Sequence, residues 1–231
     1  MSKVNKLFPL AAILIAAVIY GLSVLIEIKL APPAHLGAYA SILNHGSMLL
    51  LSVLAIWLFR NRVPFHVSWP KLKTIFKPIL LAIALTLVIN LLFNVIIIAA
   101  GGEVVAHPVA AKMNFAQTFL LVFLLASIAE EALCRGFLQN SLASLKDKGI
   151  KVFGIQLSLP VIISAVFFGL MHLILLTAHP GFAFLARVVT FTTALGLMAG
   201  YYQEKYDNFS YAVIVHMAGN LLGLVGSLMA A

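Results

Sequence analysis

Seven long apolar segments alternate with short polar connections along the chain. Each segment is about 20 residues long, the length of an α-helix that crosses the hydrocarbon core of a bilayer. The pattern predicts an all-α fold, a polytopic transmembrane helical bundle of seven spans, with six to eight as the range. The predicted spans are Leu7–Ile26, Ala38–Phe59, Pro78–Ala100, Phe115–Leu138, Leu157–Leu176, Phe182–Tyr202 and Tyr211–Ala230.

The composition agrees with this pattern. Hydrophobic residues make up 63% of the 231 residues and charged residues only 10%, whereas a soluble domain typically carries about 25% charged residues. We expect residues 1–231 to form one membrane-embedded domain. The first apolar segment exceeds the roughly 7–15 residues of a signal-peptide core, so it is predicted to be a retained span.

The net charge of +8 comes mainly from basic clusters beside the predicted spans. Such clusters mark cytoplasmic loops, so the N-terminus is predicted to be cytoplasmic, in the cell membrane if the protein is bacterial. This explanation of the charge is preferred to nucleic-acid binding. The clustered residues are Lys3, Lys6, Arg60, Arg62, Lys71, Lys73, Lys77, Lys146, Lys148 and Lys151.

Residues 136–151, after the fourth span, differ from a plain loop. Phe137, Leu138, Leu142 and Leu145 recur at helical spacing among polar residues. An apolar stripe of this kind is typical of a helix that lies in the membrane interface. We therefore predict an amphipathic elbow after the fourth span.

Two adjacent glutamates lie inside the fourth span. A charged side chain at the bilayer centre costs about 2.5–3.5 kcal/mol on insertion scales. Glu131 and Arg135 are four residues apart and meet on one helix face, so they are predicted to form a neutralised pair. Glu130 points about 100° away and is left for a different partner. The alternative is a purely structural ion pair with one protonated glutamate.

Later spans carry histidines and an asparagine. His172 alone is more typical of a hydrogen-bonded packing residue, whereas His216 and Asn220 share one helix face. Combined with Glu130, these residue types activate water and stabilise an oxyanion, or ligate a catalytic metal in a His₂Glu arrangement. A serine triad finds little support.

The other polar groups within the spans are assigned to packing and interhelical contact. Cys134, the only cysteine, is expected to be a small buried hydrophobe. Arg187 is expected to snorkel or to pair with a buried acid. Gly196 and Gly200 form a face of small residues for tight helix packing. The predicted interhelical hydrogen-bonders are Asn44, His45, Asn90 and Asn94.

The order and spacing of these residues resemble three motifs of one family, the CAAX protease and bacteriocin-processing family (CPBP, also called Abi). Its motifs read EExxxR, FxxxH and HxxxN/D. Each motif alone is weak, but all three in order on separate spans form a specific signal. The resemblance covers about residues 115–223 and leaves three N-terminal spans in residues 1–114. The matching segments are Glu130-Glu131-x-x-x-Arg135, Phe168-x-x-x-His172 and His216-x-x-x-Asn220.

The resemblance implies an intramembrane endopeptidase related to the type II CAAX prenyl endopeptidases. By motif position, Glu130 is the water-activating carboxylate and His172 assists it. His216 and Asn220 would stabilise the oxyanion.

Two further roles follow from the same resemblance. Glu131 and Arg135 would orient the catalytic groups. No cofactor is certain, although Glu130, His172 and His216 could equally ligate Zn²⁺ or another divalent metal.

The predicted boundaries place Glu130 in the inner half of the membrane and His172 in the outer half. For these residues to meet, the fourth helix must tilt or continue past Leu138, or the fifth must start before Leu157. We expect the site near mid-depth, in a conical cavity between the fourth, fifth and seventh spans that opens toward the cytoplasm.

The predicted partners are the lipid bilayer and a peptide or protein substrate that reaches the membrane. CAAX-type processing of prenylated proteins and processing of bacteriocin or other leader peptides fit the residues equally well. The alternative function is a non-catalytic membrane scaffold or bacteriocin self-immunity protein of the same fold. A proton-coupled transporter would show inverted repeats, which the sequence lacks. The oligomeric state stays open.

Overall fold

A computed structural model describes residues 7–31, 39–105, 113–152, 154–179 and 181–229. Seven helices in this part of the chain are long and apolar enough to cross a membrane, which confirms the predicted fold class and number of spans. A small two-stranded hairpin is the only sheet among the described residues. The chain is therefore an integral, multi-pass membrane protein.

The spans follow one another with short connections. The fourth span begins with α4 (Phe115–Gln117), and α5 (Ser127–Glu131) lies between π-helical segments at Thr118–Ala126 and Ala132–Gln139. π-Helical segments are rare and occur frequently at functional sites. The complete spans are α1 (Phe8–Leu30), α2 (Ala40–Leu58), α3 (Leu72–Ala99), α4–α5 (Phe115–Gln139), α6 with its 3₁₀ extension (Leu159–Ala178), α7 (Phe182–Tyr206) and α8 (Ser210–Met229).

The third span begins earlier than the sequence predicts. Pro78, taken as its first residue, lies inside α3, six residues after Leu72. Pro78 is the seventh residue of α3, so its missing N–H removes the hydrogen bond that this position would otherwise make to the carbonyl of Thr74. The two turns before Pro78 carry Lys73 and Lys77, so the helix extends beyond its apolar stretch into polar surroundings.

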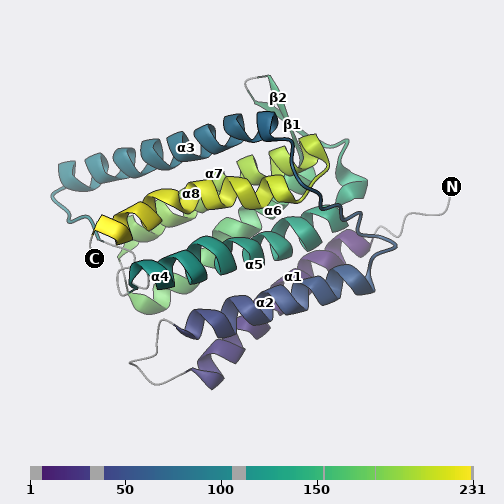
Figure 1. Cartoon of the computed structure of the whole chain (residues 1–231), viewed down its shortest axis with the longest axis horizontal. Coiled ribbons are helices and arrows are strands. Elements are labelled where there is room, and N and C mark those ends of the chain that lie inside the picture. The colour runs from purple at the N-terminus through teal and green to yellow at the C-terminus, as the bar shows by residue number, and fades with distance from the viewer. Residues whose placement is uncertain (1–6, 32–38, 106–112, 153, 180, 230–231) are drawn as a thin grey trace.

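The fourth span lies in the middle of the bundle. Figure 1 shows α1 and α2 on one side of α4–α5, with α8, α7 and α3 on the other. The segment from α5 onward packs against α2 and α1, and also against α6 and α8. The fourth span therefore contacts both the N-terminal helix pair and the C-terminal helices.

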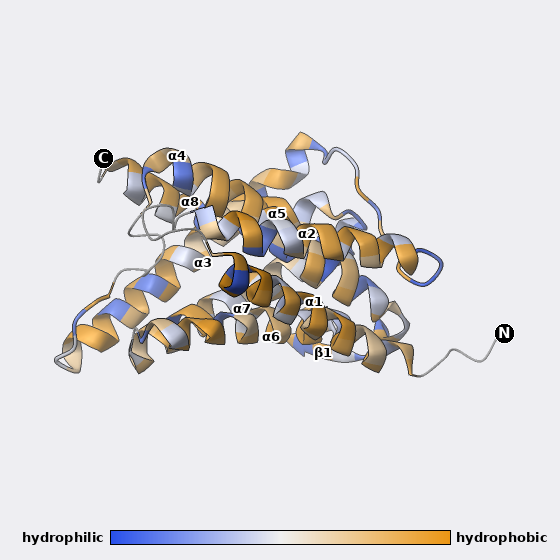
Figure 2. Ribbon diagram, turned by 90° about the horizontal axis from the view of Figure 1, so that it is seen from below, coloured by the Kyte–Doolittle hydropathy of each residue, from blue (hydrophilic) through white to orange (hydrophobic). Residues whose placement is uncertain are grey.

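The outer faces of the helices are apolar. Figure 2 shows hydrophobic residues along most of the helical ribbon, with hydrophilic residues mainly in the connections. Large side chains such as Leu10, Leu14, Leu80 and Leu91 are more than half exposed. Exposed apolar side chains of this extent suit contact with lipid rather than with water.

The elbow after the fourth span takes a different form from the predicted interfacial helix. The backbone stays helical to Ser141, makes a 3₁₀ turn at Ala143–Leu145, and enters a hairpin of β1 (Gly149–Val152) and β2 (Ile155–Ser158). Phe137, Leu138 and Leu142 are fully buried in the protein. The apolar stripe therefore packs against the bundle instead of lying on a lipid surface. We call this end of the bundle the hairpin end.

Candidate functional site

Glu131 and Arg135 form the buried ion pair that their spacing predicts. Arg135 Nη1 donates to Glu131 Oε1 at 2.9 Å, and both side chains are sealed from solvent, at 0% and 1% exposed. The Arg135 guanidinium also stacks over the ring of Phe168, 4.8 Å from its centroid. The pair joins α5 to α6 and neutralises one of the two glutamates.

His216 lies between the two glutamates. Its Nδ1 is 2.8 Å from Glu131 Oε1, and its Nε2 is 3.6 Å from Glu130 Oε2. Because an ionised carboxylate only accepts hydrogen bonds, Nδ1 donates to Glu131 and the other ring nitrogen faces Glu130. The division expected from helix geometry, with Glu131 tied to Arg135 alone, is therefore incomplete.

His172 lies at the C-terminal end of α6, where the α-helix becomes a 3₁₀ helix. Its Nδ1 is 2.9 Å from the carbonyl oxygen of Phe168. Since a carbonyl only accepts, Nδ1 carries the proton and Nε2 of the neutral ring keeps a lone pair. The ring of Phe168 packs edge-on against both His172 and His216, at 5.1 and 5.3 Å between centroids. Phe168 thus sets the position of two histidines, a role that exceeds simple packing.

The helix that carries Glu130 continues past Leu138 to Ser141, which is one of the expected ways for Glu130 and His172 to meet. No direct hydrogen bond joins Glu130 and His172 among the described side chains, but the ring of Phe168 packs against both His172 and His216, and His216 contacts Glu130. The motif residues Glu130, His172 and His216 are thus gathered in one region.

Asn220 has a different neighbour from the one the motif suggests. Its Nδ2 donates to Ser127 Oγ at 3.1 Å, and Ser127 lies one helical turn before the glutamates. Asn220 is partly buried, and the contact holds α8 against α5. Ser127 therefore orients the amide group of Asn220, and the sequence does not point to Ser127 as a site residue.

His45 is the site residue that the sequence reasoning missed. Its Nε2 lies 3.3 Å from Glu130 Oε1. His45 was assigned to interhelical hydrogen bonding, which is correct, but its partner is the central carboxylate. A lone histidine in an apolar span was the available signal, and nothing in the sequence linked it to a residue 85 positions away.

The site has a sealed side and an accessible side. Glu131, Arg135 and His216 are almost completely buried, whereas the side chains of His45 and Glu130 are 20% and 13% exposed. Glu130 and His45 are therefore the more exposed members of the cluster. Of the sealed groups, His216 contacts Glu130.

A divalent metal at this site stays a prediction. Among the described residues, no three histidine, cysteine or acidic side chains are placed so that they could hold a metal ion. Nδ1 of His172 is held by the Phe168 carbonyl and Nδ1 of His216 by Glu131, so Nε2 is the nitrogen that each ring leaves available.

The other intramembrane polar groups have structural roles. Cys134 is buried, with its Sγ 3.7 Å from Met171 Sδ, as expected for a packing residue. Arg187 donates to Asn94 Oδ1 at 3.0 Å and to the carbonyl of Val105 at 2.8 Å, so its partner is an amide and not a buried acid.

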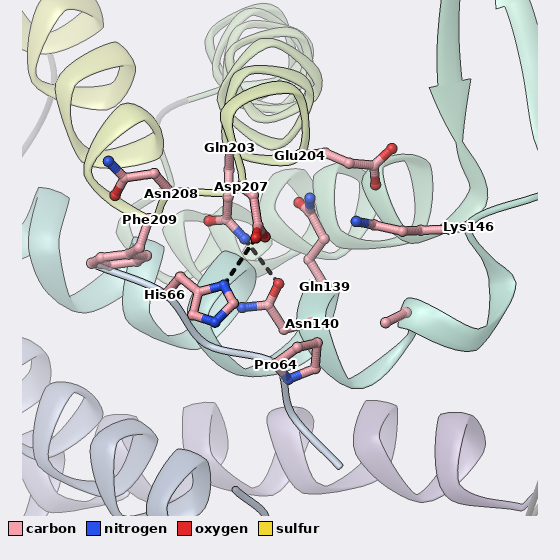
Figure 3. A pocket seen from close by; sticks show the side chains of 11 residues that line it. Pro64, His66, Gln139, Asn140, Lys146, Gln203, Glu204, Asp207, Asn208 and Phe209 are labelled. Atoms are coloured by element: carbon pink, nitrogen blue, oxygen red, sulfur yellow. Dashed lines mark hydrogen bonds and ion pairs between the residues drawn. The ribbon is translucent and has the colours of Figure 1, made fainter. Parts of the chain in front are cut away.

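A second polar cluster lies near the hairpin end and is shown in Figure 3. His66 pairs with Asp207 at 2.9 Å, joining the α2–α3 loop to the α7–α8 turn. Gln203 donates to Asn140 Oδ1 at 3.1 Å and to the carbonyl of Arg135 at 3.2 Å. The cluster therefore fastens the helix ends together and supports the backbone beneath the buried ion pair.

Gly196 allows α7 to approach the ion pair. A Cβ at this position would lie 2.5 Å from Arg135 Nη2 and 3.1 Å from the Cα of Ala165. We expect Gly196→Ala to destabilise the fold by about 1–3 kcal/mol, because overpacking forces neighbours to move. The measurement is thermal unfolding in detergent. Gly223→Ala is the matched control, since a Cβ there meets nothing within 4 Å; equal unfolding temperatures for the two variants would refute the close approach.

The comparisons with known proteins give one match. A family model described as "Type II CAAX prenyl endopeptidase Rce1-like" matches residues 112–222. The matched segment begins just before α4, ends within α8, and contains the residues of all three motifs. No curated protein and no solved structure matches the chain. The spans α1, α2 and α3 lie outside the matched segment.

Proposed function

We propose that this protein hydrolyses a peptide bond within the membrane, using water activated by Glu130 and His172. The match of residues 112–222 to the Rce1-like type II CAAX prenyl endopeptidase model supports this proposal. The observation that carries the proposal is the placement of Glu130. Its carboxylate lies between two histidines, at the accessible edge of a site whose other glutamate is neutralised by Arg135. Glu130 is thus the carboxylate left free to accept a proton.

Each group has a distinct task in the proposed reaction. A water molecule donates one hydrogen bond to Glu130 and one to the lone pair on Nε2 of His172. Glu130 takes the water proton as the oxygen attacks the scissile carbonyl, which is general-base catalysis. The proton then passes to the departing amine, so that the peptide bond breaks into a carboxylate and an amine.

The developing oxyanion needs hydrogen-bond donors on the other side of the carbonyl. Asn220 supplies an amide N–H₂ and His216, in its protonated form, supplies Nε2–H. A well-placed donor of this kind lowers the barrier by about 2.7–4 kcal/mol. Glu131 accepts a hydrogen bond from His216, and Ser127 accepts one from Asn220, so both donors are held in position.

Truncation of Asn220 tests this assignment. We expect Asn220→Ala to lower kcat by about 100- to 1,000-fold with little change in KM, because the lost donor acts mainly on the transition state. Steady-state kinetics on a cleaved peptide measure both constants. Asn90→Ala serves as the control, since Asn90 donates to a carbonyl of its own helix. An unchanged kcat in Asn220→Ala would remove Asn220 from the oxyanion site.

The substrate is proposed to be a peptide that reaches the site between α5, α6 and α8. We place the N-terminus and the hairpin end on the cytoplasmic side, since the basic residues of the α2–α3 loop and of the segment before β1 gather there. Residues of both segments, His66 and Lys146, line the same pocket at that end. CAAX-type C-termini and bacteriocin or other leader peptides both remain candidate substrates.

Chelation tests the chemistry of water activation. We expect cleavage to persist after dialysis against EDTA, because Glu130 contacts His45 and His216 directly and the described residues contain no three-ligand set. The measurement is the initial rate before and after chelation, with a zinc endopeptidase treated in parallel. A loss of activity that Zn²⁺ restores would replace the proposed mechanism by a metal-assisted one.

A further inference from the structure

The structure brings a residue from outside the family-matched segment into the centre of the site. His45 on α2 contacts Glu130 on α5, and α2 lies outside residues 112–222. We propose that His45 is a positioning residue for Glu130: its Nε2–H holds Oε1, so that Oε2 faces His216 and the attacking water. The proposal rests on the peptidase function argued above and adds a task for the N-terminal helices.

The imidazole of His45 is itself held in place. Its Nδ1 lies 2.8 Å from Ser41 Oγ and 3.0 Å from the Ser41 carbonyl oxygen, one turn earlier on α2. The ionised Glu130 carboxylate only accepts hydrogen bonds, so Nε2 carries a proton toward it. The two contacts of Nδ1 with Ser41 fix the direction of the ring: the carbonyl accepts when Nδ1 carries a proton, and the hydroxyl donates when it does not.

The helix that carries His45 is anchored next to the site. Asn44, the neighbouring residue, donates to Glu27 Oε2 on α1 at 2.5 Å. Tyr20, also on α1, donates to the carbonyl of Met171 at 2.5 Å, directly before His172. The α1–α2 pair is therefore connected to α6 at Met171, the residue before His172. The helix that carries His45 is thereby connected, through α1, to the end of α6.

Two anchored histidines leave the Glu130 carboxylate little rotational freedom. Oε1 lies 3.3 Å from His45 on α2 and Oε2 lies 3.6 Å from His216 on α8, and these two helices lie on opposite sides of α4–α5 (Figure 1). A general base works only when its oxygen lies on the path of the proton that it abstracts. A displacement of about 1 Å can reduce a rate by a factor of about 100. Loss of His45 should therefore lower kcat while substrate binding is preserved.

Three variants on α2 test the proposal in the full-length protein. His45→Phe keeps the ring but removes the donor, and we expect kcat to fall about 10- to 100-fold with KM within about twofold. His45→Gln restores an N–H donor close to the position of Nε2, and we expect it to recover most of the lost kcat. Ser47→Ala is the control on the same helix, because Ser47 donates only to carbonyls of α2; its kcat should equal that of the wild type.

The outcomes separate this proposal from the proposed function. Wild-type kcat in His45→Phe, with cleavage still dependent on Glu130, would overturn the role of His45 alone. Equal losses in His45→Phe and His45→Gln, together with equally lowered unfolding temperatures, would show a packing role and also overturn it. Absence of any peptidase activity in the wild-type protein would reject the function and this proposal with it.

Discussion

Replacing Glu130 by glutamine is expected to reduce peptide cleavage by at least about 1,000-fold, the upper range of a general-base contribution. Glutamine keeps the size of the side chain and can still accept a hydrogen bond from His45. It cannot take a proton from water, so the loss reports on chemistry and not on shape. Initial rates with the purified variant in lipid vesicles measure the effect.

The Glu130→Gln result needs evidence that the fold survives. Glu130 is partly exposed and makes no ion pair with an arginine or lysine in the described chain, so the unfolding temperature should stay near that of the wild type. Glu204→Gln is the matched control, since Glu204 accepts from Ser158 near the hairpin end. Wild-type rates in Glu130→Gln would remove this residue from the reaction.

Replacing Arg135 by methionine is expected to destabilise the fold by about 3–5 kcal/mol, because Glu131 is left buried without its cation. The same change removes the guanidinium from the face of Phe168, so both histidines that pack on this ring lose support. Thermal or denaturant unfolding in detergent measures the stability. Activity should fall with it, since Glu131 also holds His216.

A double variant separates lost charge from lost packing. Glu131→Gln combined with Arg135→Met removes both charges, and we expect it to regain part of the stability lost in Arg135→Met, since no unpaired charge remains. The control Arg60→Met removes an exposed arginine that stacks on Trp57 and should change stability by less than about 0.5 kcal/mol. Wild-type stability in Arg135→Met would contradict the buried-pair account.

The spans are predictable from sequence because a long apolar stretch has few alternatives in a membrane chain. Their ends are less predictable where helical residues are polar. Lys73 and Lys77 extend α3 beyond its apolar stretch, so the sequence places its start too late. The hairpin at Gly149–Val152 and Ile155–Ser158 was missed because each strand is only four residues long.

The sequence predicts those contacts of the site that are made within one helix or one motif. The spacing of Glu131 and Arg135 is enough to predict their pair. Contacts between helices are not encoded in spacing, so the bond from His216 to Glu131 and that from Asn220 to Ser127 were not foreseen. His45 is the extreme case, because no motif includes it.

The central claim is that Glu130 drives peptide hydrolysis, and one experiment tests it most directly. The purified wild-type protein and its Glu130→Gln variant, each in lipid vesicles, are incubated with the same library of membrane-associated peptides. New peptide termini are then identified by mass spectrometry. The account predicts defined cleavage products with the wild type and none with the variant. Identical product profiles for the two proteins, or no products from either, would contradict it.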